Sequence, residues 1–344
     1  MPAPLPWRAA WQQALYGPGG FYRGYAGPAA HFTTATHGAT GAVLARALWA
    51  WADRLGCDGI VDVGAGRGEL LAHLRAVEPT SPLTGVDVVE RPDALPRTVG
   101  WLTAPGGSEL PDELAPRGAL VVAHEWLDVV PCTVAEADGA GTLREVLVDP
   151  VSGVESLGEA LDDVDRAWCE RFWPTTELVR AAGGRKSVHP RARTGREGGG
   201  VPVEGRRVEV GRARDEAWAA LLDRLDGGAA VAVDYGHTLG ERPVGGSLTA
   251  YREGRVVDPV PDGSCDLTAH VAVDSLLHDR LLRQTTALDE VGIRGRRPDH
   301  ALATQDPAAY LAGLAESSAV AALRQAGGFG DFWWVVAGRT RIDS

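Results

Sequence analysis

Three glycines follow an apolar run in the segment GIVDVGAGRGELL, residues 59–71. The apolar residues predict a buried strand, and the residues after the last glycine predict the start of a helix. Gly64, Gly66 and Gly68 lie at the junction, where backbone N–H groups and a helix N-terminus can approach a nucleotide or nucleoside. The spacing is GxGxG, whereas the fingerprint for dinucleotides is GxGxxG. We therefore expect a smaller ligand group, such as the amino-acid part of S-adenosylmethionine, rather than NAD(P).

Acidic residues on either side of this turn could bind the rest of such a ligand. Asp62 lies within the strand and can accept hydrogen bonds from the turn or bind the ligand's ammonium group. Ala65 lies within the turn itself. A ribose needs an acceptor about 20 residues further on, at the end of the second strand. Asp87 and Glu90 are the candidates in the strand predicted over 83–90.

A second pair of acids follows the strand predicted over 118–125. Glu125 and Asp128 are three residues apart, so we expect them to share one face of a turn that begins a helix. Such carboxylates can hold a guanidinium group and assist its deprotonation as it attacks a methyl carbon. The alternative is a simple cap, because acids in a first helical turn are favoured by the helix dipole.

Other side chains are candidates for the border of the same pocket. Asp234, Tyr235 and His237 end a later strand, and His237 is either a general base or a structural histidine bonded to a loop carbonyl. Asp266 is predicted to cap a helix that starts near Thr268, in a structural role or at the substrate rim. The aromatic residues of the N-terminal loops are expected to form a lid or core; they are Tyr16, Phe21, Tyr22 and Phe32.

Composition limits the class of protein. The chain has 344 residues, 44% hydrophobic residues and a formal net charge of -12, which predicts a globular protein of two domains or one enlarged α/β domain. An acidic chain argues against nucleic acid as a partner. The four cysteines are far apart, so we expect no metal site and no disulfide framework. With no signal peptide and no run long enough to span a membrane, we expect a cytoplasmic protein.

Apolar periodicity predicts an α/β doubly wound sheet. Helices are expected over 6–16, 41–56, 68–77, 158–171 and 174–182, and strands over 59–63, 83–90, 118–125, 228–236, 246–252, 281–288 and 332–338. Residues 132–138 and 143–149 are expected to pair antiparallel. Four regions follow: an N-terminal region (1–58), a ligand-binding core (59–150), an inserted helical segment (151–227) with a mobile basic loop over 183–205, and the remaining sheet and substrate-side elements (228–344).

The chain resembles the MidA family of class I S-adenosylmethionine-dependent methyltransferases. The segment VDVGAGRGELL is similar to their first motif. The segments ALYGPGGFY, HFTTATHG, VERPDAL, HEWLDVVP, RRVEV, AVDYGH, GSLTAYR and DPVPDGSCDLTAHV occur in the family's order. The resemblance implies a Rossmann-like sheet with helices on both faces, with S-adenosylmethionine as cofactor. It also implies arginine methylation of a protein, since mitochondrial members are arginine methyltransferases that assist complex I assembly.

The resemblance also ranks the site residues. Its register selects Glu90 over Asp87 as the ribose acid, and it places an Asn-Glu-x-x-Asp motif at residues 124–128. This chain has His124 in place of the asparagine, which puts arginine specificity in question because the charge of imidazole varies near neutral pH. Two alternatives are methylation of a small molecule and a catalytically inactive assembly factor that binds the methyl donor. The oligomeric state is left open, a homodimer being one option.

Overall fold

The computed structural model describes residues 3–24, 34–174 and 205–338. Its helices are α1 (Trp7–Tyr16), α2 (Gly38–Arg54), α3 (Glu69–Val77), α4 (Asp163–Phe172), α5 (Arg212–Asp223), α6 (Gln284–Glu290), α7 (Leu302–Gln305) and α8 (Pro307–Leu323), with short 3-10 turns η1 (Phe21–Arg23), η4 (Leu239–Glu241) and η5 (Phe329–Asp331). Almost all of the helix predicted over 174–182 and of the basic loop over 183–205 lies outside the described residues, as does Phe32.

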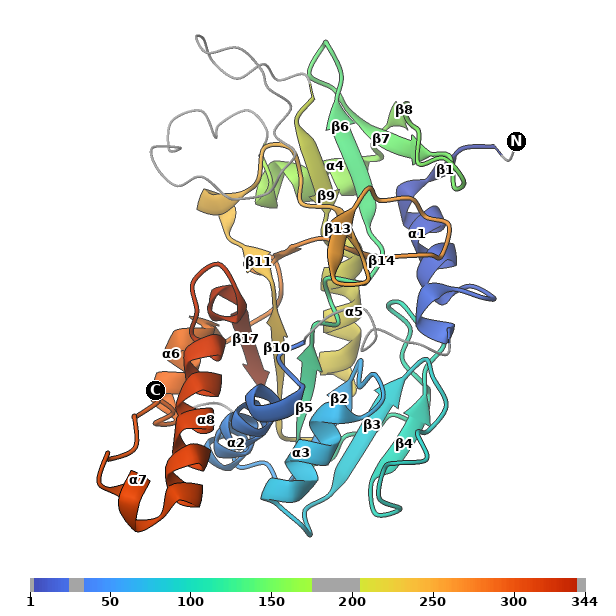
Figure 1. Cartoon of the computed structure of the whole chain (residues 1–344). Coiled ribbons are helices and arrows are strands. Elements are labelled where there is room, and N and C mark those ends of the chain that lie inside the picture. Colours follow the sequence, from blue (N-terminus) through green and yellow to red (C-terminus); the bar gives the residue numbers. More distant parts are fainter. Residues whose placement is uncertain (1–2, 25–33, 175–204, 339–344) are drawn as a thin grey trace.

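Seven strands form the central sheet, in the order β16-β17-β10-β5-β2-β3-β4 (Figure 1). They are β2 (Gly59–Val63), β3 (Leu83–Asp87), β4 (Gly100–Thr103), β5 (Ala119–His124), β10 (Ala229–Asp234), β16 (Arg280–Arg283) and β17 (Trp333–Gly338). The strands from β4 to β10 are parallel, whereas β17 is antiparallel to both of its neighbours. The order of the strands reverses at β2. The next strands in the chain, β3 and β4, lie on one side of it, and the later strands β5 and β10 lie on the other.

Helices cover both faces of this sheet because its central strands are apolar on both faces. In β10, Val231 and Val233 pack into a core with α2, α3 and α8, while Ala230 and Ala232 pack against Trp218 of α5 on the other face. This alternation follows from the two-residue period of a strand. Such double coverage is typical of parallel sheets.

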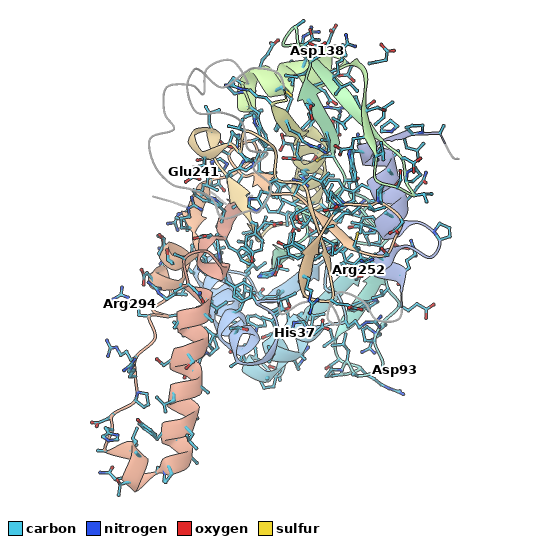
Figure 2. The ribbon with its side chains drawn as sticks, turned by 45° about the horizontal axis from the view of Figure 1, so that its top comes forward. His37, Asp93, Asp138, Glu241, Arg252 and Arg294 are labelled. Carbon is cyan, nitrogen blue, oxygen red and sulfur yellow. The ribbon has the colours of Figure 1, made fainter. Side chains whose placement is uncertain are left out.

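A second sheet lies beyond the carboxyl end of the central one (Figure 1). It has the order β1-β7-β6-β9, with β8 also paired to β7. Its strands are β1 (Leu5–Pro6), β6 (Thr133–Ala137), β7 (Leu143–Val148), β8 (Glu155–Ala160) and β9 (Arg207–Val210). In Figure 2 the label Asp138 at the top marks the tip of its β6–β7 hairpin, and Arg294 lies at the left, beside α8.

Two small sheets complete the fold. One has the order β13-β12-β14, from β12 (Thr249–Arg252), β13 (Arg255–Val257) and β14 (Asp266–Thr268). The other pairs β11 (Gly236–His237) with β15 (Val271–Ala272). The helix α1 packs its Trp7 and Trp11 into a core shared with β6, β7 and β14. The N-terminal segment is thereby fixed over the end of the central sheet.

The structure corrects several predicted elements. Residues 155–160 form the strand β8, so the helix predicted over 158–171 begins only at Asp163, where Asp162 caps it through the N–H of Asp165. Residues 284–290 form α6, where a strand was expected to run to 288. No helix starts near Thr268, because this segment is strand β14. The predicted region boundaries also cut across the sheets, since β6 and β7 belong to the second sheet and not to the ligand-binding core.

The antiparallel pair of residues 132–138 and 143–149 is confirmed as β6 and β7. The predicted strand–turn–helix over 59–77 is confirmed as β2 and α3. No described helix is long and apolar enough to span a membrane.

Candidate active site

The reversal of the strand order at β2 predicts where a ligand can bind. In open α/β sheets the crevice lies outside the carboxyl ends of two strands whose connections run in opposite directions. Here those strands are β2 and β5. A cavity opens at this position, lined by the glycine turn after β2, the residues after β5 and the N-terminal segment; it encloses about 1220 Å³ of empty space, counting its open mouth.

The glycine turn requires glycine for backbone reasons. Gly64, Gly66 and Gly68 have φ values of 76°, 58° and 81°, in the left-handed region that other residues rarely adopt. A Cβ on Gly68 would also lie 2.7 Å from the side chain of Leu95, and one on Gly64 would lie 3.3 Å from that of Trp126. Other residues at these positions would be strained, and at Gly68 the added Cβ would also clash, so the turn keeps its shape only with glycine.

Two carboxyl groups line the cavity beside this turn. Asp87, the last residue of β3, accepts a hydrogen bond from the N–H of Gly66 at 2.8 Å and from that of Val89 at 3.2 Å. Burial raises the pKa of Asp87 to about 6. Burial also raises the pKa of Asp62 to about 8, and the nearby charge of Asp87 adds to this shift. Both groups line the cavity, and a bound cation would favour their charged forms.

The two candidate ribose acids differ in their position relative to the cavity. Glu90 is exposed and is not among the residues that line the cavity, whereas Asp87 does line it. The strand β3 ends at Asp87, and Val88 and Val89 also line the cavity, so Glu90 is the first residue after the strand that lies outside the lining. The geometry therefore favours Asp87 over Glu90.

The acidic pair after β5 also lines the cavity, but on a turn and not on a helix. Glu125 has φ 51°, an unusual conformation for a residue with a side chain, and its N–H donates to the carbonyl of Val233. The N–H groups of Leu127 and Asp128 both donate to Oδ2 of Asp234, at 3.0 and 3.2 Å. Asp234, at the end of β10, thus organises the turn. The alternative of a helix cap is wrong, since the element after β5 is the strand β6 and not a helix.

Buried oxygen atoms on this pair have no hydrogen-bond partner among the described residues. They are Oε1 of Glu125 and Oδ1 of Asp128. The other oxygen of Asp128 accepts a 2.6 Å hydrogen bond from the hydroxyl of Thr268. Burial raises the pKa of Glu125 to about 8, with a further contribution from the charge of Asp128. Leaving buried acceptors unpaired costs about 1–3 kcal/mol each, so a ligand with N–H donors would be stabilised here.

His124 is neutral near pH 7. Burial lowers its pKa to about 4, so its charge does not vary in the neutral range as the sequence suggested. Its Nδ1 lies 3.2 Å from Oε1 of Glu125 but outside hydrogen-bonding geometry, and its ring packs edge-on against Phe332. The contact with Glu125 is therefore not a charged pair near pH 7.

An arginine that the sequence did not predict to be functional binds main-chain carbonyl groups in and near this turn. Arg214 of α5 is 1% exposed and donates to the carbonyl oxygens of Asp128, Val130 and His270, at 2.9, 3.2 and 3.0 Å. Its guanidinium also lies over the ring of Trp11. No sequence motif indicates this role, because Arg214 is far along the chain from the carbonyl groups that it binds.

Other predicted residues are divided between the cavity and the core. Tyr16, Tyr22 and Asp266 line the cavity, whereas Phe21 belongs to the core cluster of α1. His237 lies away from the cavity lining, and its Nδ1 is 2.7 Å from Arg242, which supports a structural role and not that of a general base. Within the described residues no group of three or more His, Cys, Asp or Glu side chains could hold a metal ion.

The sequence of the chain matches a known family. A family model described as "Putative S-adenosyl-L-methionine-dependent methyltransferase" matches residues 43–290, which is more than half of the chain. The chain belongs to this family. S-adenosylmethionine is the cofactor of the family, and the prediction of this cofactor is confirmed at that level.

Solved structures show the same fold. A COG1565 superfamily member from Burkholderia thailandensis, bound to S-adenosyl-homocysteine, is 22% identical with a TM-score of 0.69, and the match covers 98% of this chain and 88% of that one. A native structure of a COG1565 superfamily protein from the same organism is also 22% identical, with a TM-score of 0.67 and coverage of 98% and 87%. The predicted α/β methyltransferase fold is confirmed. A search of curated proteins found no match.

Proposed function

We propose that this chain methylates a cationic nitrogen group, and that its acceptor is an arginine side chain of a protein. The observation that carries the proposal is the pair of buried, unpartnered oxygens on Glu125 and Asp128. A guanidinium group offers five N–H donors in a planar fork, which suits two neighbouring carboxylates. The resemblance to the MidA family supports the same substrate. A cytoplasmic location is part of this proposal.

The donor end of the cavity fits S-adenosylmethionine. The backbone of the glycine turn, Asp62 and Asp87 would hold it, because its amino-acid part is cationic at the ammonium group and its ribose presents hydroxyl donors. When bound, S-adenosylmethionine supplies a methyl group on a positively charged sulfur, so that the new bond to the acceptor nitrogen replaces the bond to sulfur and leaves a neutral thioether.

Residues of the turn after β5 have separate roles in this proposal. Asp128 binds and orients the guanidinium, since Thr268 and Arg214 fix its position. Glu125 accepts the proton that the attacking nitrogen loses, because a guanidinium does not lose a proton near neutral pH without a base. His124 packs beside Glu125 as a neutral ring and limits its movement.

Methylation of a small molecule is the second candidate. It is favoured by His124, which stands where the resemblance implies an asparagine. A third candidate is an inactive assembly factor that binds the donor without transfer. The resemblance to complex I assembly proteins is what supports this third role.

One labelling experiment separates these candidates. The purified chain is incubated with S-adenosylmethionine carrying a labelled methyl group and with cell lysate, and the labelled species are then identified. Methylarginine in a protein, absent with the Glu125→Gln variant, is the expected result. Label confined to small metabolites would favour the second candidate. Donor binding by calorimetry with no transfer to any fraction would favour the third.

A further inference from the structure

The strand β14 carries two polar residues to the acceptor end of the cavity. Asp266 and Thr268 are two positions apart, so they lie on the same face of the strand. Thr268 donates to Asp128, and Asp266 lines the cavity together with Glu125 and Asp128. Leu267 between them is fully buried in the core around α1, where its carbonyl accepts a hydrogen bond from Trp11.

Asp266 is fixed by a tyrosine from the far end of the chain. The hydroxyl of Tyr22 donates to Oδ1 of Asp266 at 2.6 Å, across a separation of 244 residues. The ring of Tyr22 packs on Tyr16, with 5.4 Å between centroids, and edge-on against Phe21. The carboxyl of Asp266 is therefore held in one position, and the residue is only 5% exposed.

Asp266 lines the cavity beside two other acidic groups, Glu125 and Asp128. Burial raises its pKa to about 8, and the charge of Asp128 adds to the shift. Arg214 is the nearby cation among the described residues that contact this turn, but its N–H groups donate to main-chain carbonyls and it does not line the cavity. A cation from outside would balance the acidic groups that meet here.

We propose that Asp266, positioned by Tyr22, is a specificity-determining residue: with Glu125 and Asp128 it forms a three-carboxylate pocket that selects a positively charged acceptor group. This inference rests on the proposed function only in taking this end of the cavity as the acceptor site. The two acids after β5 come from one turn. The third comes from β14 in another sheet, so carboxyl groups from two separate segments line the pocket.

The test uses two small probes of similar shape and different charge. Methylguanidinium and N-methylurea are titrated by NMR into the full chain saturated with S-adenosylhomocysteine. We expect the wild-type chain to prefer the cation, and Asp266→Asn to weaken methylguanidinium at least tenfold while leaving N-methylurea within twofold. Asparagine keeps an oxygen for Tyr22, so the substitution removes mainly charge. Tyr22→Phe should weaken methylguanidinium about threefold.

A matched control and the donor separate this role from a structural one. Asp93→Asn changes an exposed acid outside the cavity lining and should alter neither probe (Figure 2). The affinity for S-adenosylhomocysteine should stay unchanged in all variants. An equal loss of both probes, an unchanged preference in Asp266→Asn, or no preference in the wild type would overturn the inference. If Asp266→Asn does not fold, Tyr22→Phe decides. Absence of methyl transfer would overturn the proposed function without altering this binding result.

Discussion

The two ends of the cavity, which we propose bind the methyl donor and the acceptor, are built in different ways. The donor end is one continuous strand–turn–helix segment, plus one acid at the end of the adjacent strand. The acceptor end brings together Tyr22, the turn after β5, Asp234, Arg214 and β14, which are scattered over about 250 residues. The donor end therefore depends on local backbone conformation, and the acceptor end depends on tertiary contacts.

The largest expected effect separates chemistry at the acceptor end from binding at the donor end. Glu125→Gln removes the proposed proton acceptor while keeping the shape of the side chain. We expect kcat to fall by roughly 10²–10⁴, the range for loss of a general base, with the affinity for S-adenosylhomocysteine unchanged within threefold. Release of S-adenosylhomocysteine with the labelled acceptor measures kcat, and calorimetry measures affinity.

The control for this variant is Glu113→Gln, which changes an exposed acid outside the cavity lining. Equal losses of kcat in both variants would remove Glu125 from the mechanism. A large loss of donor affinity in Glu125→Gln would show that the two ends are not independent.

The next effect tests whether the donor end is set by its backbone. Gly66→Val places a β-branched residue at φ 58°, a conformation that costs about 1–3 kcal/mol, and disturbs the N–H that donates to Asp87. We expect calorimetry to show a roughly 30-fold loss of affinity for S-adenosylhomocysteine. Gly240→Val, where the new side chain meets open space, should bind as the wild type does. Full affinity in Gly66→Val would contradict a backbone-built site.

A smaller effect separates the two candidate ribose acids. Asp87→Asn should weaken binding of S-adenosylhomocysteine about tenfold, because a carboxylate accepts hydrogen bonds more strongly than an amide. Glu90→Gln should change it less than twofold, since Glu90 is exposed and outside the cavity lining. The reverse order of effects would restore the interpretation from the family register.

The smallest effect is a pH dependence at the donor end. The pKa of Asp62 is raised to about 8, so most ligand-free molecules carry a neutral carboxyl at pH 6. The ammonium group of the ligand favours the carboxylate of Asp62, so binding at pH 6 must expel a proton. The affinity for S-adenosylhomocysteine should therefore rise severalfold from pH 6 to pH 8, and less in Asp62→Asn.

The stability of the ligand-free protein should change in the opposite direction. Between the unfolded pKa near 3.9 and about 8, the native state holds a proton that the unfolded state has lost, so the free energy of unfolding falls as pH rises. Thermal unfolding should give a lower Tm at pH 8 than at pH 6, with a smaller difference in Asp62→Asn. A Tm that rises over this interval would contradict a buried neutral Asp62.

Three segments differ from their predicted structure for physical reasons. The helix expected after β5 was inferred from two acids three residues apart, but Asp234 takes both N–H groups of that turn and holds it in a different conformation. Residues 155–160 form a strand because β7 offers them an edge to pair with. Asp266 was assigned to a helix cap because nothing in its own segment indicates that Tyr22 and Thr268 connect it to the cavity.

The sequence by itself determined the parts that depend on local backbone. The glycine turn, its strand and its helix could be predicted because positive φ values, apolar runs and helical periodicity leave signals in neighbouring residues. Only the tertiary structure decided which acids share the cavity, that Asp87 and not Glu90 faces it, and that Arg214 supports the acceptor turn. These features depend on which distant segments the sheets bring together, and burial then shifts the pKa values of the acids that meet there.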